Sequence, residues 1–216
     1  QMDCKDFIAR LLPSSGLDCL DIQPWRDHCK NLRSKYWPVM VDNMDPTRVN
    51  MHNFLHSLSK NSDNNDQIIL GNAGFHVTVG WQAYQVKKGQ RLIHEVGAGV
   101  MGHSLPSSIG IALGNPDKRT IIMTGDGGIQ VNLQELQTIL TYKLPIKLFI
   151  MENGGYLSLI NTQKKYFDGR MIGSTPESGL ALPDFRKLLP AYGFKFNCVY
   201  TDAALESAIA ENLSTP

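Results

Sequence analysis

The chain has little cysteine, almost no excess charge and no long apolar run. Its four cysteines, Cys4, Cys19, Cys29 and Cys198, show no C-x-x-C spacing, so we expect free thiols and neither disulfides nor a zinc site. The net charge is +1, and the scattered basic residues give no electrostatic footprint for a nucleic acid. No apolar stretch approaches the roughly 20 residues that cross a bilayer, and no secretory signal begins the chain. We therefore expect a cytoplasmic protein that binds neither nucleic acid nor membrane.

The length and composition are those of a globular protein with one main domain. A chain of 216 residues can bury one substantial core. From about residue 46 onward, short β-like apolar runs alternate with longer helical ones. Such alternation predicts an α/β fold, in which a parallel sheet is covered by helices on both faces and ligands bind at the carboxyl ends of the strands.

The expected elements follow from periodicity and from glycine and proline positions. We expect helices over 49–58, 77–85, 107–113, 131–144, 185–191 and 203–212, and strands over 67–70, 91–96, 120–124, 146–151 and 195–200. Before them, 6–12 looks like the end of a helix, 24–36 like an amphipathic helix and 38–46 like a linker. The sequence shows no internal repeat.

Two glycine-rich turns, each directly after an expected strand, are the most informative feature. Asp126 lies in a G-D-G turn after strand 120–124, and Asn153 lies in an E-N-G-G turn after strand 146–151. Oxygen ligands of this kind suit a hard cation such as Mg²⁺, which usually also binds phosphate oxygens and water. Glycine lets the backbone approach an anion closely, and the free N–H groups of a helix start favour negative charge. The paired turns predict a metal–diphosphate site.

This arrangement resembles the thiamine-diphosphate signature of the acetolactate synthase-like enzymes, in which N-N follows G-D-G. Other segments agree in the family's order, namely G-V-M-G at 99–102, L-P at 105–106, N-L-Q-E-L at 132–136, N-G-G-Y at 153–156, P-D-F at 183–185 and A-Y-G at 191–193. The resemblance is dense from about residue 49 to 199. It implies the thiamine-diphosphate-binding fold, the cofactors thiamine diphosphate and Mg²⁺, and a 2-oxo acid decarboxylase or carboligase.

The resemblance also implies a role for each matching residue. Asp126 and Asn153 would bind the cation through their side chains, and Gly155 through its backbone oxygen. The other cofactor-binding positions are Gly71, Asn72, Gly99, Met101, Gly127, Gly128, Ile129 and Tyr156. Among these, the backbone N–H groups of 127–129 would reach the diphosphate, and the Met101 side chain would hold the cofactor in its bent shape.

Three positions depart from the family's pattern. Glu152 replaces the first Asn of the pair, a position that does not ligate the metal. Ala73 has no polar group where acetolactate synthases often carry a diphosphate-binding His, and Thr162 lies where they carry a Trp that shapes the substrate pocket. The identity of the substrate therefore stays open.

The resemblance further implies domains beyond this one. Residues 1–12 look like the tail of a preceding middle domain, 13–45 like a linker, and 46–216 like a cofactor domain that we expect to be truncated at its C-terminus. In the family, the activating Glu comes from a pyrimidine-binding domain of a second chain. Glu95 and Glu152 do not match that position. We therefore expect this chain to be inactive alone and to require that missing domain, in a homodimer or tetramer.

Other hypotheses remain at this point. His103 could face a substrate and is kept as a candidate catalytic residue, whereas His76 and His94 are expected to be ordinary loop or packing histidines. The segment 97–102 fits G-x-G-x-x-G, which would make a nicotinamide-dependent dehydrogenase with Asp126 on the ribose, but this leaves the Asn153 turn without a role. A third hypothesis is a cofactor-binding subunit that catalyses nothing.

Overall fold

The computed structural model describes residues 2–14, 20–36, 45–71, 73–95 and 97–215, in two units that divide between Pro38 and Val39. The first unit contains α1 (Cys4–Ser14) and α2 (Gln23–Tyr36), which confirms the two expected helices. The expected linker 38–46 lies mostly outside the described residues. None of the described helices is both long and apolar enough to cross a membrane.

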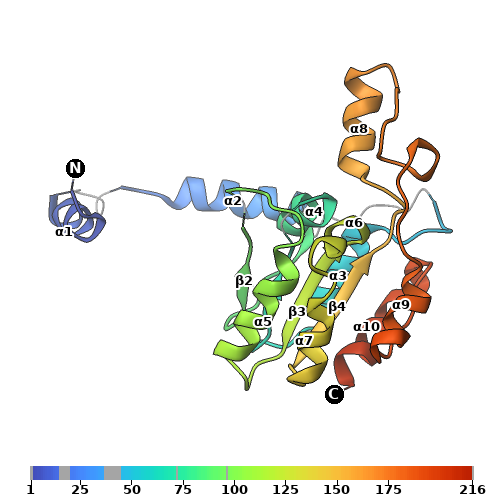
Figure 1. Ribbon diagram of the computed structural model, residues 1–216. Helices are drawn as coiled ribbons and strands as arrows, with labels where there is room; N and C mark the ends of the chain where they lie inside the picture. The colour runs from blue at the N-terminus through green and yellow to red at the C-terminus, as the bar shows by residue number, and fades with distance from the viewer. Residues whose placement is uncertain (1, 15–19, 37–44, 72, 96, 216) are drawn as a thin grey trace. The chain divides into compact units, whose positions relative to one another are not determined.

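The described part of the second unit is built on a four-stranded sheet in which all strands run parallel, in the order β2-β1-β3-β4 (Figure 1). The strands are β1 (Gln67–Ile69), β2 (Arg91–Ile93), β3 (Thr120–Gly125) and β4 (Ile146–Met151). Gly125 is paired with Met151 at the ends of the two strands. The residues that follow them therefore leave the same edge of the sheet side by side.

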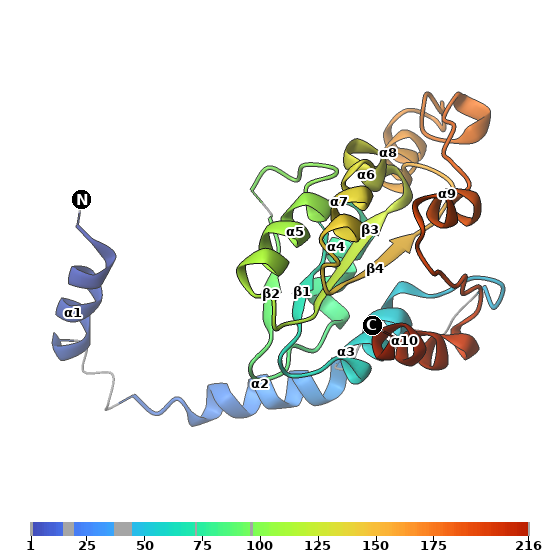
Figure 2. The ribbon, with the colours of Figure 1, turned by 60° about the horizontal axis from the view of Figure 1, so that its bottom comes forward.

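Helices cover both faces of this sheet (Figure 2). One face carries α3 (Met51–Asn61), α4 (Phe75–Ala83) and α10 (Leu205–Ser214), and the other carries α5 (Ser104–Gly114), α7 (Glu135–Thr141) and α9 (Phe185–Tyr192). The expected α/β fold, a parallel sheet between two helical layers, is confirmed.

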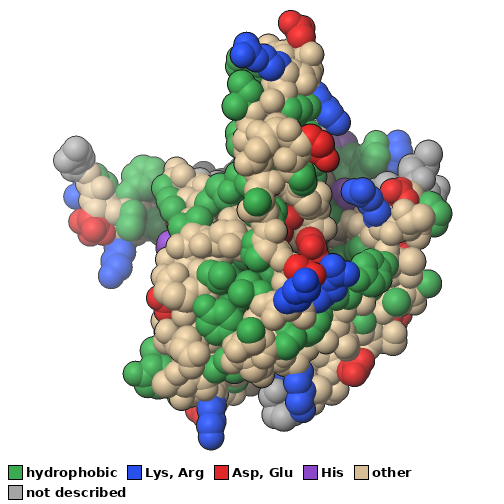
Figure 3. Space-filling model, turned by 45° about the vertical axis from the view of Figure 1, so that its right-hand side comes forward, with side chains coloured by type: hydrophobic (Ala, Val, Ile, Leu, Met, Phe, Trp, Pro, Cys, Tyr) green, Lys and Arg blue, Asp and Glu red, His purple; other side chains and the backbone are tan. Residues whose placement is uncertain are grey.

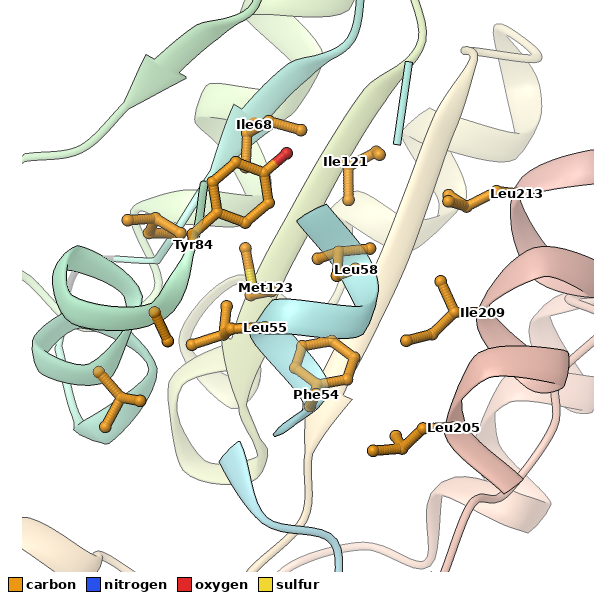
Figure 4. Packing of buried hydrophobic residues seen from close by; sticks show 13 residues of the cluster. Phe54, Leu55, Leu58, Ile68, Tyr84, Ile121, Met123, Leu205, Ile209 and Leu213 are labelled. Atoms are coloured by element: carbon orange, nitrogen blue, oxygen red, sulfur yellow. The ribbon is translucent and has the colours of Figure 1, made fainter. Parts of the chain in front are cut away.

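The period of two along the strands divides the buried side chains between the two faces. Ile121 and Met123 of β3 pack with Leu55 and Leu58 of α3 in the first cluster (Figure 4). Ile122, between them, belongs to the second cluster, with α5, α7 and α9. Because both faces are covered, the strand sequence is almost continuously apolar. Each fully buried Leu or Ile contributes roughly 1.5–3 kcal/mol.

The start predicted for the helix over 131–144 is wrong, because the first helical turn begins at Asp126. The structure has α6 (Asp126–Ile129), then the 3-10 turn η2 (Gln130–Asn132), and only then α7. Gly125 is extended and acts as the N-cap residue, so the chain enters a helical turn at Asp126 itself. Glycine favours turns, so the sequence pattern predicts a turn where the structure starts a helix.

The strand expected over 195–200 is wrong, since no strand is present there. Phe194 and Phe196 pack against the second cluster and Val199 against the first, without joining the sheet. The alternation of polar and apolar residues over 195–200 therefore reflects packing against the two buried clusters and not pairing with the sheet. The remaining expected elements are present, with ends shifted by a few residues.

One helix, α8 (Leu157–Tyr166), was not expected from the sequence. It has no buried residue, so apolar periodicity gave no signal for it. Figure 3 shows it projecting from the body of this unit, at the top of the view. The short 3-10 turns η3 (Pro176–Ser178) and η4 (Asp202–Ala204) lie between α8 and α10 in the chain.

Candidate functional site

The centre of the site is the Asp126 carboxylate, which is only 2% exposed at the carboxyl end of β3. Its Oδ1 accepts a hydrogen bond from its neighbour Gly127 N at 2.7 Å. Its Oδ2 accepts from the backbone N–H groups of Asn153 and Gly154, both at 2.9 Å. The two sequence turns therefore meet, and one buried carboxylate joins them.

The second turn is held in shape by its own side chain. Asn153 Oδ1 accepts from Gly155 N at 3.2 Å, and Gly154 has a φ of +76°, which favours glycine. Gly155 O accepts from Leu157 N at 3.2 Å. Asn153 is an exposed residue.

Glycine is needed at two positions because other groups lie against the backbone. A Cβ added at Gly127 would overlap the Tyr156 ring, and one at Gly155 would lie 2.5 Å from the carbonyl oxygen of Ser174. That carbonyl also accepts from Tyr156 N at 3.0 Å. Tyr156 thus covers the G-D-G turn from the direction of β4. The sequence carried no signal for Ser174, because α8 and the loop after it separate Ser174 from Gly155 and Tyr156 in the chain.

The 99–102 segment lies beside the start of the helix that follows Asp126. Asn132 Nδ2 donates to Gly102 O at 3.0 Å. A Cβ added at Gly102 would lie 2.5 Å from Val131 Cβ, and one at Gly128 would lie 4.0 Å from Gly102 N. The segment that contains Gly99 and Met101, two expected cofactor-binding positions, is therefore adjacent to the segment that is expected to reach the diphosphate.

The turn after β1 lies at the same edge of the sheet, where the His76 ring lies between Gly71 and Gly125. Gly71 has a φ of +83°, and a Cβ added there would overlap the His76 ring. The same ring lies 3.7 Å from a Cβ added at Gly125. His76 is buried, and this burial, with the nearby His94, lowers its pKa from 6.5 to about 4. From the sequence alone, His76 was expected to be an ordinary loop or packing histidine.

These donors and acceptors fit a hydrated divalent cation bound to phosphate. A carboxylate offers about four lone-pair positions, and Asp126 uses three for backbone N–H groups, so it can still bind one cation. The Asn153 Oδ1 and the Gly155 carbonyl oxygen each accept one hydrogen bond. Each therefore keeps a second lone pair that can bind a cation. The described residues contain no group of three or more His, Cys, Asp and Glu side chains arranged for a metal. Of the candidate ligands Asp126, Asn153 and Gly155, Asp126 alone is a carboxylate.

Other candidate residues are placed less closely. Asn72 lies outside the described residues. Gly99 and Met101 are exposed. His103 Nδ1 lies 2.9 Å from Ser107 Oγ at the start of α5. Glu95 Oε1 accepts from Ala98 N at 2.8 Å, which stabilises the loop after β2.

Comparison with known proteins agrees with this geometry. The family model described as thiamine pyrophosphate enzyme, C-terminal TPP binding domain, matches residues 72–216. The chain belongs to this family. The NAD-binding hypothesis is therefore not favoured, since the G-x-G-x-x-G segment lies within a thiamine pyrophosphate-binding domain.

Among its relatives are acetolactate synthase large subunits. The isozyme 3 large subunit of Escherichia coli is 35% identical over 149 residues, 68% of this chain and 25% of the relative. The Cyanidium caldarium large subunit is 38% identical over 137 residues, 63% and 23% of the two chains. The E. coli isozyme 1 large subunit is 25% identical over 219 residues, 100% and 37% of the two. The chain thus spans about a quarter to a third of the relatives it matches.

Proposed function

We propose that this chain binds thiamine diphosphate with Mg²⁺ and forms the cofactor half of an active site. The reaction would be decarboxylation of a 2-oxo acid, with the product released or joined to a second carbonyl compound. The observation that carries the proposal is the buried Asp126 carboxylate, which bridges the two glycine-rich turns and retains one lone-pair position. Its chain neighbours Gly125, Gly127 and Gly128 have no side chain to stand between the backbone and an anion.

In this proposal the chain's own residues bind and orient the cofactor. Asp126, the Asn153 side chain and the Gly155 backbone oxygen hold the cation. The backbone of 127–129 faces the diphosphate, Gly71 and Asn72 lie on its far side, and the 99–101 segment lies along the aminopyrimidine ring. Thiamine diphosphate supplies the electron sink for the bond that breaks next to the carbonyl group, and the protein supplies binding, shape and electrostatics.

We further propose that a second domain completes the site. Support comes from the relatives, of which this chain matches only about a quarter to a third. The carboxylic acid that activates the pyrimidine ring would come from that domain, on the partner chain of a homodimer or tetramer. General acid–base help of this kind is typically worth about 10²–10⁴-fold in rate. Substrate identity depends on the same missing surface.

The test is calorimetric titration of thiamine diphosphate, with and without Mg²⁺, into the full-length natural polypeptide that contains this chain. Asp126→Ala should abolish Mg²⁺-dependent binding, because it removes the single carboxylate that balances the cation. Asp117→Ala is the matched control, since Asp117 is an exposed turn residue away from the site. Equal affinity of wild type and Asp126→Ala would reject the role of Asp126. Binding of NAD in place of thiamine diphosphate would reject the proposed function.

A further inference from the structure

The segment between Gly155 and Ser174 leaves the turn after β4 and returns to it. It contains α8 and the loop that follows this helix. Tyr156 N donates to Ser174 O at 3.0 Å, so a hydrogen bond joins the two ends of the segment. Ser174 is fully buried at this junction, and a Cβ added at Gly155 would lie 2.5 Å from the same carbonyl oxygen. The Ser174 backbone therefore lies directly against the turn that carries two of the proposed cation ligands.

This hydrogen bond fixes the direction of the Gly155 carbonyl group. The Gly155 C=O and the Tyr156 N–H belong to one planar peptide unit, and in a trans peptide they point in opposite directions. Because Ser174 O holds the N–H side of this unit, the Gly155 carbonyl oxygen is directed away from Ser174. A backbone oxygen that ligates a cation must point at it. The position of Ser174 therefore determines whether Gly155 can act as a ligand.

Ser174 is in turn held by Gln163, a half-buried residue in the middle of α8. Ser174 Oγ donates to Gln163 Oε1 at 2.6 Å. Gln163 Nε2 donates to Ile172 O at 3.1 Å, and Gln163 Oε1 accepts from Ile172 N at 3.5 Å. From the other side, Ser178 Oγ accepts from Ser174 N at 3.0 Å. One side-chain amide thus binds two residues of the returning loop and holds Ser174 in place.

Burial does little to anchor α8 itself. None of its residues is buried, and Figure 3 shows the helix projecting from the body of its unit. Hydrophobic stabilisation is roughly proportional to the apolar area removed from water, so it is small for this helix. We therefore assign the anchoring of the returning loop on α8 to the hydrogen bonds of Gln163.

We propose that Gln163 is a positioning residue for the cation. Through Ser174 it holds the Gly155 carbonyl oxygen in the direction that ligation requires. This inference rests on the proposed function, in which Gly155 is one of three protein ligands. Gln163 acts here through other residues, by limiting the rotation of one peptide unit. Groups that orient metal ligands in this way typically contribute about 10–100-fold to metal affinity.

The experiment measures the Mg²⁺ concentration that half-saturates thiamine diphosphate binding to the full-length natural polypeptide. Gln163→Met keeps the length of the side chain and removes its hydrogen bonds, whereas Gln163→Glu keeps the acceptor for Ser174 Oγ. Gln137→Met on α7 is the matched control, because Gln137 is exposed and its Nε2 donates to Thr141 of the same helix. We expect Gln163→Met to raise the Mg²⁺ concentration about tenfold. Gln163→Glu should stay within about threefold of wild type, and the control should match it. An equal loss in both Gln163 variants would overturn the inference.

Replacement of Mg²⁺ by Ca²⁺ separates a displaced ligand from a general loss of structure. Mg²⁺ requires near-ideal octahedral geometry, whereas Ca²⁺ accepts flexible geometry. A Gly155 carbonyl that is free to rotate should therefore weaken Mg²⁺ binding more than Ca²⁺ binding. The half-saturating concentration in Gln163→Met should rise less for Ca²⁺ than for Mg²⁺. Equal weakening of both cations would contradict a positioning role.

A measurement without cofactor distinguishes this inference from the proposed function. Hydrogen exchange of the unliganded polypeptide should be faster at the Tyr156 amide in Gln163→Met than in wild type, because Ser174 O no longer holds that N–H firmly. Faster exchange with unchanged Mg²⁺ affinity would give Gln163 a structural role only, which overturns the inference and leaves the cofactor site standing. If wild type binds no thiamine diphosphate, both proposals are wrong.

A second variant serves if Gln163→Met does not fold. Ser174→Ala removes the same side-chain hydrogen bond and leaves those between Gln163 and Ile172 in place. It should raise the half-saturating Mg²⁺ concentration in the same direction and speed exchange at the Tyr156 amide. Wild-type behaviour of Ser174→Ala in both measurements would overturn the inference.

Discussion

The two edges of the central sheet use polar groups in opposite ways. At the amino ends of the strands, Arg119 donates from Nε and Nη2 to both carboxylate oxygens of Asp66, at 2.9 and 2.6 Å, and from Nη1 to Leu213 O at 2.7 Å. Asp66 also accepts from Asp63 N at 2.6 Å. Lys147 adds a hydrogen bond to Thr215 O. These bonds tie the end of α10 to the starts of β1 and β3.

At the carboxyl ends the polar groups face backbone N–H groups and glycines. Asp126 accepts only backbone N–H groups and keeps one lone-pair position. The imidazole of His76 faces glycines. Closed polar networks stabilise a fold, whereas buried groups with spare hydrogen-bonding capacity cost stability and provide binding. We therefore interpret the amino edge as structural and propose the carboxyl edge as the binding edge.

Removal of the Arg119 guanidinium at the amino edge should have the largest effect on the stability of the fold. Arg119→Leu leaves Asp66, whose side chain is 3% exposed, as an unpaired buried charge, which costs about 3–5 kcal/mol. Urea unfolding measures this loss, and thiamine diphosphate affinity of the folded protein should not change. Lys60→Ala is the control, because the Lys60–Glu206 pair is 62% exposed on both sides and should cost less than about 1 kcal/mol. A loss below about 1 kcal/mol for Arg119→Leu would contradict a structural amino edge.

Acidification should weaken the protein through His76 at the carboxyl edge. Its pKa is about 4 in the folded state and 6.5 ordinarily, so the unfolded chain binds a proton in this window and the folded protein does not. Stability therefore falls as the pH drops from about 6.5 toward 4, by up to roughly 3 kcal/mol, and this contribution then levels off. Urea midpoints between pH 7.5 and 5 measure it. An identical pH slope in His76→Phe would exclude His76 as the source.

Crowding of the G-D-G turn should have a smaller effect. In Gly127→Ala the new methyl group overlaps the Tyr156 ring, and overpacking of this kind costs about 1–3 kcal/mol. Tyr156→Leu should relieve much of this cost in the double variant, so the two substitutions should be non-additive. Gly110→Ala is the control, because an added Cβ there meets nothing within 4 Å and should be neutral or slightly stabilising in a helix. Strict additivity would show that the ring is not the obstacle.

The smallest effect is expected for Glu152→Asn. Glu152 is exposed next to the site, while its neighbours Asn153 and Gly154 make the contacts to Asp126. Mg²⁺-dependent binding should stay within about tenfold, or roughly 1.4 kcal/mol. Calorimetry checks it. A thousandfold loss would identify Glu152 as a ligand and would shift the whole set of metal positions by one residue.

Most of the architecture of the second unit could be predicted from local patterns. Alternating short and long apolar segments predicted a parallel sheet between helices, and parallel strands bring their carboxyl ends to one edge. That topology alone implied that Asp126 and Asn153 would meet, and in the structure Asn153 N binds the Asp126 carboxylate. From the sequence, glycine at 127 predicted a close approach of the backbone to an anion, and Gly155 was expected to bind the cation through its backbone oxygen.

Tertiary structure decided which groups make those approaches. The Tyr156 ring lies on Gly127, Ser174 O lies against Gly155, and His76 faces Gly71 and Gly125. It also placed the start of α6 at Asp126 and left 195–200 out of the sheet. Periodicity records which side chains are apolar, because burial repeats with the backbone geometry. Periodicity does not predict which distant backbone group or ring contacts a glycine, because such contacts depend on how separate elements pack in three dimensions.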